Sequence, residues 1–84
     1  MPQSDMMMLL MQLQMDLNSL TLSCIETNSC VTSLLELYSD KVQSYTTIHD
    51  RCVRWSRAIG MMSDALEKFQ ADANKLGDYL DAQG

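Results

Sequence analysis

The stretch CVRWSRAIGMMSDALEKFQADANKLGDYL, residues 52–80, places an apolar side chain in each of two rows every seven residues. The first row, position a of a heptad, holds Cys52, Ile59, Leu66, Ala73 and Leu80. The second row, position d, holds Trp55, Met62, Phe69 and Leu76. Two such rows form one apolar stripe on an α-helix, and a stripe of this kind is typical of a helix that packs against another helix.

The same heptad frame continues back through the chain to Met6. Upstream, the a row holds Leu10, Leu17, Cys24, Val31, Tyr38 and Tyr45, and the d row holds Met6, Leu13, Leu20, Thr27, Leu34, Lys41 and Ile48. Apart from Thr27 and Lys41 every a and d residue is apolar, which makes 20 of 22 positions. Chance would give about 10 at this composition. The frame therefore predicts an all-α protein, either a long amphipathic helix or an antiparallel helical hairpin, that acts as a coiled-coil or helical-bundle subunit.

The length of 84 residues predicts one domain with little room for a core. We expect residues 1–4 to be a disordered N-terminus and residues 5–82 to be the coiled-coil helical region, capped by Ser4 or Asp5. The heptad pattern ends after Leu80. A helix with one apolar stripe encloses nothing alone, so the chain must fold back on itself or join other helices.

Two stretches rich in short polar and β-branched residues are candidate helix breaks, near residues 26–30 and 44–47. In the second, Thr47 and Asp50 have the spacing of a capping box with Asp in place of Glu. A break there leaves arms of about 40 and 36 residues, which favours a hairpin because its arms must match. The frame crosses both stretches without a shift, however, which fits one continuous helix, so both arrangements remain open.

The residues beside the a and d rows indicate several neighbouring helices. The e and g positions carry few charges, and the apolar surface widens between Cys30 and Tyr45, which favours a bundle of three or more helices. Large Trp55 and small Ala73 pack more easily against different residues than against their own copies, which favours a hetero-oligomer. At position d, Lys41 is expected to reach water through its long stem, or else to meet a partner's carboxylate.

The N-terminal segment is apolar on most sides of the expected helix. It contains Met6, Met7, Met8, Leu9, Leu10, Met11, Met15, Leu22 and Ile25. A helix of this kind is normally enclosed by other helices, and methionine adapts to irregular surfaces. We expect inclusion in a bundle core, with a specific docking peptide as the alternative.

The candidate interface residues are apolar residues of the a and d rows together with Leu35. They are Leu10, Leu13, Leu17, Leu20, Val31, Leu34, Leu35, Tyr38, Tyr45, Ile48, Cys52, Trp55, Ile59, Met62, Leu66, Phe69, Leu76 and Leu80.

Charge and motifs exclude several classes of function. The net charge is −5, and no Lys or Arg precedes Lys41, so the chain lacks the basic footprint of a nucleic-acid-binding protein. We expect Arg51, Arg54 and Arg57 to lie on a solvated face, with Asp50 paired to Arg54.

No motif indicates chemistry. His49 and Cys52 share a helix face but are too few to hold zinc, and no catalytic constellation accompanies them. We expect no enzyme activity, cofactor, metal or small-molecule substrate. The three cysteines form an odd set without a secretory signal or a membrane span, which predicts a cytoplasmic protein with Cys24 and Cys52 as small core residues.

The predicted function is that of a structural subunit that contributes one or two long helices to a hetero-oligomeric coiled-coil complex, with other helical proteins as partners. One alternative is a small acidic helical chaperone for an aggregation-prone partner, such as a secretion-system component. Another is a homo-oligomeric coiled-coil spacer or adaptor, which the uncharged e and g rows disfavour.

Overall fold

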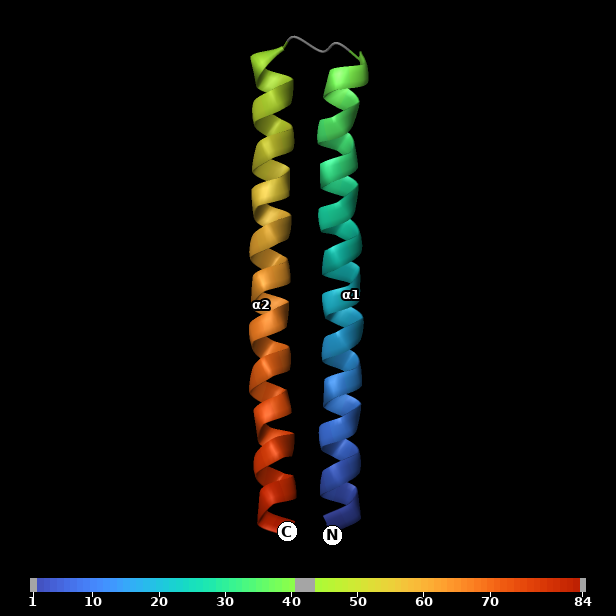
Figure 1. Ribbon diagram of the computed structural model, residues 1–84, viewed down its shortest axis with the longest axis vertical. Coiled ribbons are helices and arrows are strands. Elements are labelled where there is room, and N and C mark those ends of the chain that lie inside the picture. The colour runs from blue at the N-terminus through green and yellow to red at the C-terminus, as the bar shows by residue number, and fades with distance from the viewer. Residues whose placement is uncertain (1, 41–43, 84) are drawn as a thin grey trace.

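The protein is an antiparallel helical hairpin. The computed structural model describes residues 2–40 and 44–83, with side chains for residues 4–37 and 44–83. Helix α1 (Pro2–Asp40) and helix α2 (Tyr45–Gln83) have 39 residues each and lie side by side, with both chain termini at one end (Figure 1). The hairpin is 61 Å long and 15 Å by 13 Å across. The all-α prediction is confirmed, and of its two arrangements the hairpin is the one observed.

Both helices extend beyond the predicted ends of the helical region. Helix α1 begins at Pro2, so the prediction that residues 1–4 are disordered is wrong for residues 2–4. Proline suits a first helical position because the amide hydrogen that it lacks has no partner there. At the other end, α2 continues past Leu80 to Gln83.

The polar stretch around residues 26–30 does not break α1. Its threonine hydroxyls donate to carbonyls one turn earlier, from Thr27 Oγ1 to the Ser23 oxygen (2.8 Å) and from Thr32 Oγ1 to the Asn28 oxygen (3.1 Å). These bonds satisfy the hydroxyls within the helix. The hydroxyls therefore do not compete for the backbone hydrogen bonds of the helix, which would favour a turn.

The second helix starts at a different cap from the one predicted. The Thr47 amide donates to Ser44 Oγ at 3.4 Å, and the Ile48 amide donates to the Ser44 carbonyl at 3.2 Å. Ser44 is therefore the N-cap of α2, and Thr47 and Asp50 lie within the helix. Lys41 and the side chain of Tyr38 lie outside the described part of the chain.

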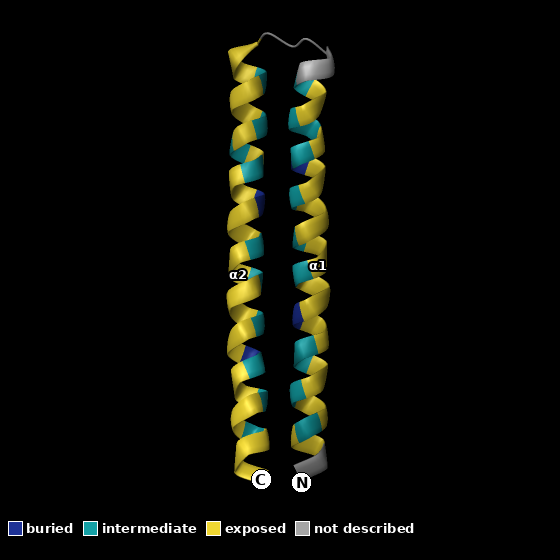
Figure 2. Cartoon of the chain, in the orientation of Figure 1, coloured by how far each residue is buried: buried dark blue, intermediate teal, exposed yellow. Residues whose placement is uncertain are grey.

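The line of contact between the helices, here called the seam, is formed by positions d and g. The d row contributes partly buried side chains, which are Met6, Leu13, Leu20, Thr27, Leu34, Trp55, Met62, Phe69 and Leu76. The four most buried described residues all occupy g positions, and they are Asp16, Cys30, Ala58 and Asp72. Figure 2 shows this burial along the facing sides of the two helices. The hairpin's own seam thus uses the d row as predicted, but the g row in place of the a row.

Side-chain size explains why the g row faces inward. Ser23 and Cys30 on α1, and Ala58 and Ala65 on α2, are small residues at g. Small side chains let two helix backbones approach closely, whereas Leu at the a positions would hold them apart. The result is a rotation of each helix by roughly 50–60° from an a/d seam.

Candidate protein-interaction surface

One edge of the seam is polar and joins the helices through arginine. Arg54 Nη2 and Nε lie 2.8 Å and 3.1 Å from Glu26 Oε1, and this hydrogen-bonded carboxylate raises the pKa of Arg54. Arg51 Nη1 donates to the Ser33 carbonyl at 2.7 Å. The prediction that Arg54 pairs with Asp50 is wrong, because Arg54 extends across the seam to α1. Asp50 instead lies beside His49, with 3.6 Å between Oδ1 and Nδ1.

A layer of two buried carboxylates crosses the seam further along. Asp16 and Asp72 are only 3% and 7% exposed. Lys68 Nζ lies 3.2 Å from Asp16 Oδ1, Lys75 Nζ lies 3.3 Å from Asp72 Oδ1, and Gln12 Nε2 donates to Asp16 Oδ1 at 3.0 Å.

These neighbours set the charge of Asp16. Its pKa is lowered first by a hydrogen bond with Asp72, and further by Gln12 and Lys68, against an opposing effect of burial. Neither Oδ2 atom has a hydrogen-bond partner among the described residues, and Lys68 and Lys75 supply the positive charge next to the two carboxylates. The layer is an electrostatic contact between the helices.

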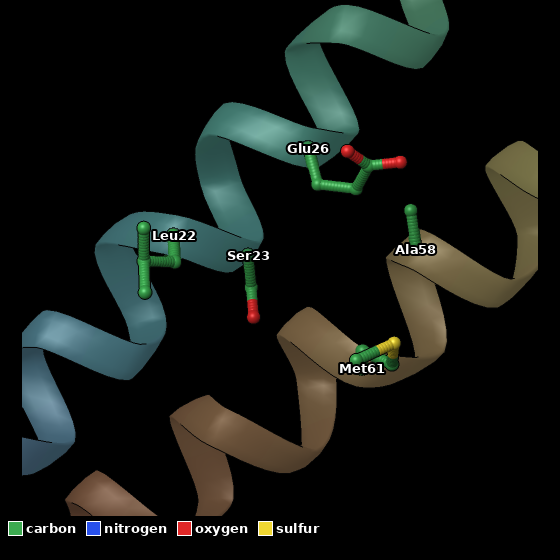
Figure 3. A pocket seen from close by; sticks show the side chains of 5 residues that line it. All are labelled: Leu22, Ser23, Glu26, Ala58 and Met61. Atoms are coloured by element: carbon green, nitrogen blue, oxygen red, sulfur yellow. The ribbon is translucent and has the colours of Figure 1, made fainter.

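A hollow lies on the same polar side of the hairpin. It has a volume of about 140 Å³ and is lined by Leu22, Ser23, Glu26, Ala58 and Met61 (Figure 3). Small Ser23 and Ala58 leave this space between the helices. It is smaller than the roughly 300–1,000 Å³ of typical ligand pockets, and its carboxylate already binds Arg54. This hollow does not favour a small-molecule ligand.

The opposite edge of the seam is apolar and exposed. Glu26 and Arg54 both occupy position c, so their ion pair shows that the two c rows meet on one side. In an antiparallel pair the two a rows then flank the seam on the other side. We call this surface the a-row face, and its large members, each 41–49% exposed, are Leu10, Leu17, Ile59, Leu66 and Leu80. Both helices therefore contribute leucine to one continuous apolar strip.

A second apolar surface lies on the side of α1 that faces away from α2, and it reaches the rim of the hollow at Leu22. It occupies positions b and f, and we call it the Met-rich face. Its members, each 60–68% exposed, are Met8, Met11, Met15, Leu22 and Ile25. The corresponding positions on α2 carry mostly polar and charged residues, including Asp50, Arg57, Asp64, Glu67 and Asp78. Only α1 is apolar on its outer side.

The predicted interface residues divide between the seam and the exposed surface. The seam contains Leu13, Leu20, Leu34, Trp55, Met62, Phe69 and Leu76, with Val31 partly buried beside them. The exposed group is Leu10, Leu17, Leu35, Tyr45, Ile48, Cys52, Ile59, Leu66 and Leu80. Contact of the exposed group with a partner remains a prediction.

The cysteines are placed differently from the sequence expectation. Cys24 and Cys52 are exposed, so their predicted role as core residues is wrong for the hairpin. Cys30 is buried in the seam, with its sulfur 3.8 Å from Glu26 Oε1. The small residues at position g are the feature of the sequence that could have predicted a seam containing Cys30.

Comparisons with known proteins return no relative: no family model, no curated protein and no solved structure matches the chain. Within residues 2–40 and 44–83, neither helix has an apolar stretch long enough to cross a bilayer. The described residues also contain no group of three or more His, Cys, Asp or Glu side chains arranged to hold a metal ion.

Proposed function

We propose that this protein is a structural interaction subunit that contributes its two-helix hairpin to a hetero-oligomeric helical bundle. The a-row face is the observation that carries the proposal. It combines apolar side chains from both helices, such as Leu17 and Leu66, and leaves them about half exposed. Burial of such a strip by another helix removes apolar area from water, which is the main favourable term in association.

The size of the face suits a specific interface. A strip along the 61 Å hairpin, about 10–12 Å wide, offers roughly 600–700 Å². Stable complexes bury about 800 Å² per partner. One or two partner helices packed on the a-row face would therefore complete a three- or four-helix bundle.

Charge and side-chain size support different chains as partners. Two copies would each carry a net charge of −5 and would repel one another. The a rows also mix leucine with the smaller Cys24, Cys52 and Ala73, and a different sequence can match such uneven layers. We place the complex in the cytoplasm, in keeping with the prediction from the free thiols.

The chaperone alternative is favoured by one observation, the exposed methionines of α1, because such surfaces adapt to different clients. The two functions differ in permanence. A subunit remains in its complex at fixed stoichiometry, whereas a chaperone releases its client. A pulse–chase measurement of the bound partner separates them.

The test compares two aspartate substitutions on α2. Leu66→Asp places a charge in the a-row face, and Ala71→Asp places the same charge on the exposed outer side, five residues away. In tagged full-length chains expressed in native cells, Leu66→Asp should lose the stoichiometric partners, and Ala71→Asp should keep them.

Circular dichroism of both variants establishes that the hairpin still forms. A second measurement uses the exposed thiols of Cys24 and Cys52, which should react at least tenfold more slowly in the complex than in the free chain. Retention of partners by Leu66→Asp, or equal thiol reactivity in the two states, would contradict the proposal.

A further inference from the structure

We propose that the Met-rich face of α1 is a second docking surface, and that its occupant is a basic amphipathic helix of another protein. This face is distinct from the a-row face that carries the proposed function. The two surfaces lie at different positions around α1, so substitutions separate them.

The geometry of the face suits one helix. Met8, Met15 and Leu22 occupy successive f positions and form a ladder about 21 Å long, at 1.5 Å per residue. Met11 and Ile25 widen it at position b. All five side chains are 60–68% exposed, far more than the half-exposed leucines of the a-row face. A partner helix of about four heptads, roughly 42 Å long, covers this ladder and extends along α1 beyond it.

Charge identifies the chemistry of the occupant. Helix α1 contains no Lys or Arg. Two of its acidic groups are satisfied by α2, through the pairs Asp16–Lys68 and Glu26–Arg54. Asp5 and Glu36 have no ion pair within the described part of the chain. A partner whose apolar stripe is flanked by Lys or Arg supplies the missing positive charge.

Asp5 and Glu36 are placed to meet such a partner. Asp5 precedes Met8 by three residues, one turn away on the same side of the helix. Glu36 continues the f row beyond Leu22 and Ser29. Among the described residues, acidic groups without an ion pair therefore lie one turn before Met8 and about 21 Å beyond Leu22, within reach of the Lys side chains of a four-heptad helix.

A second copy of this chain does not meet these requirements. If α1 packed against α1 of another copy, neither helix would offer a cation to Asp5 or Glu36. If α2 of another copy covered the face instead, its outer side would bury charged Asp64 and Glu67 against methionine, which costs free energy.

The test measures binding of two synthetic four-heptad peptides to the full-length chain by fluorescence anisotropy. Both peptides have Leu at a and d. One carries Lys at e and g, and the matched peptide carries Glu there. The Lys peptide should bind at least tenfold more tightly than the Glu peptide, and its affinity should fall as salt is raised.

Two double variants locate the binding site. Met15→Gln with Leu22→Gln removes the centre of the Met-rich face while keeping side-chain length and helix propensity. This variant should bind the Lys peptide at least tenfold more weakly. Leu17→Gln with Leu66→Gln alters the a-row face and should change the affinity less than threefold, which separates this proposal from the proposed function.

Three results would overturn the inference. The first is equal affinity for the Lys and Glu peptides. The second is unchanged binding to Met15→Gln with Leu22→Gln when circular dichroism shows an intact helix. The third is a dimer of the free chain, seen by sedimentation, that this double variant dissociates, because the occupant would then be a second copy.

Discussion

The two helices have equal length but opposite character. Helix α1 exposes nine large hydrophobic side chains among its described residues and contains no basic residue, whereas α2 exposes six and contains five Lys or Arg residues. On its outer side α2 presents mainly charged and polar groups, while α1 presents methionine, leucine and isoleucine. The difference indicates that α2 is suited to the outside of an assembly and α1 to its interior.

The seam joins these unlike helices without enclosing a core. The d-row residues are only partly buried, and two of the four buried residues are aspartates. A two-helix protein with this little apolar burial is expected to have low stability alone. We therefore expect the isolated chain to unfold readily or to aggregate through α1, and to gain stability when partners bind.

The largest effect should come from a charge in the seam. Leu34→Asp places a carboxylate between the helices and should destabilise the hairpin by about 4 kcal/mol, enough to abolish assembly. Urea unfolding followed by circular dichroism measures the change. The control Asp64→Ala, on the outer side of α2, should stay within about 0.5 kcal/mol. Equal losses in the two variants would mean that the seam is assigned to the wrong residues.

A smaller loss is expected when Trp55 is truncated. This ring is partly buried in the seam, and Trp55→Ala should cost about 2–3 kcal/mol through lost burial and a cavity. Tyr45 is 77% exposed, and Tyr45→Ala should cost well under about 1 kcal/mol. The fluorescence of Trp55 should shift to the blue when partners cover the open seam. An emission maximum in the complex equal to that of free tryptophan would rule out this burial.

Glycine substitution tests whether the outer side of α2 is free. An added Cβ at Gly60 or Gly77 would meet no atom within 4 Å. Gly60→Ala should therefore raise the free energy of unfolding by roughly 0.5–1 kcal/mol through helix propensity. Assembly should be unaffected, since α2 faces water there. Loss of partners in Gly60→Ala would place a partner against this side of α2.

The smallest effect at neutral pH is expected for Asp16→Asn. The pKa of Asp16 is lowered from its ordinary value of 3.8 by Asp72, Gln12 and Lys68, with Lys75 next to Asp72. The unfolded chain therefore takes up a proton first as pH falls through 3.8, and the stability due to Asp16 is lost below that pH. In urea unfolding, the free energy of unfolding should therefore fall less between pH 7 and pH 2 in Asp16→Asn than in the unsubstituted protein. An equal decrease in the free energy of unfolding in both proteins would contradict this contribution of Asp16 to stability.

Much of the fold was predictable because periodicity determines which residues share a helix face. The a and d rows predicted long amphipathic helix along most of the chain, and the nearly equal arms around residues 44–47 favoured a hairpin over one continuous helix. The orientation of the seam was not predictable in this way. Apolar pattern alone ranks Leu10 and Leu17 above Asp16 and Ala58 as contact residues, but close approach favours small side chains, and long-range partners such as Lys68 neutralise Asp16.

The helix boundaries were predicted at the wrong residues because short polar side chains can either interrupt a helix or be satisfied within it. Polar residues near 26–30 suggested a break, yet Thr27 satisfies its hydroxyl within the helix. Ser44 and Thr47 are both acceptable N-caps, and sequence does not rank them. The candidate interaction surface was predicted by residue type, but its division into an a-row face and a Met-rich face required the position of α2.

Methionine oxidation in the native complex is the most direct test of the central claim that partners enclose α1 but cover α2 only along its a row. Met8, Met11, Met15 and, on α2, Met61 are 60–68% exposed in the hairpin, so they should oxidise at similar rates in the free chain. Mass spectrometry after brief peroxide treatment of the complex should show at least tenfold protection of the three α1 residues, with Met61 still reactive. Oxidation of Met8, Met11 and Met15 as fast in the complex as in the free chain would contradict the account.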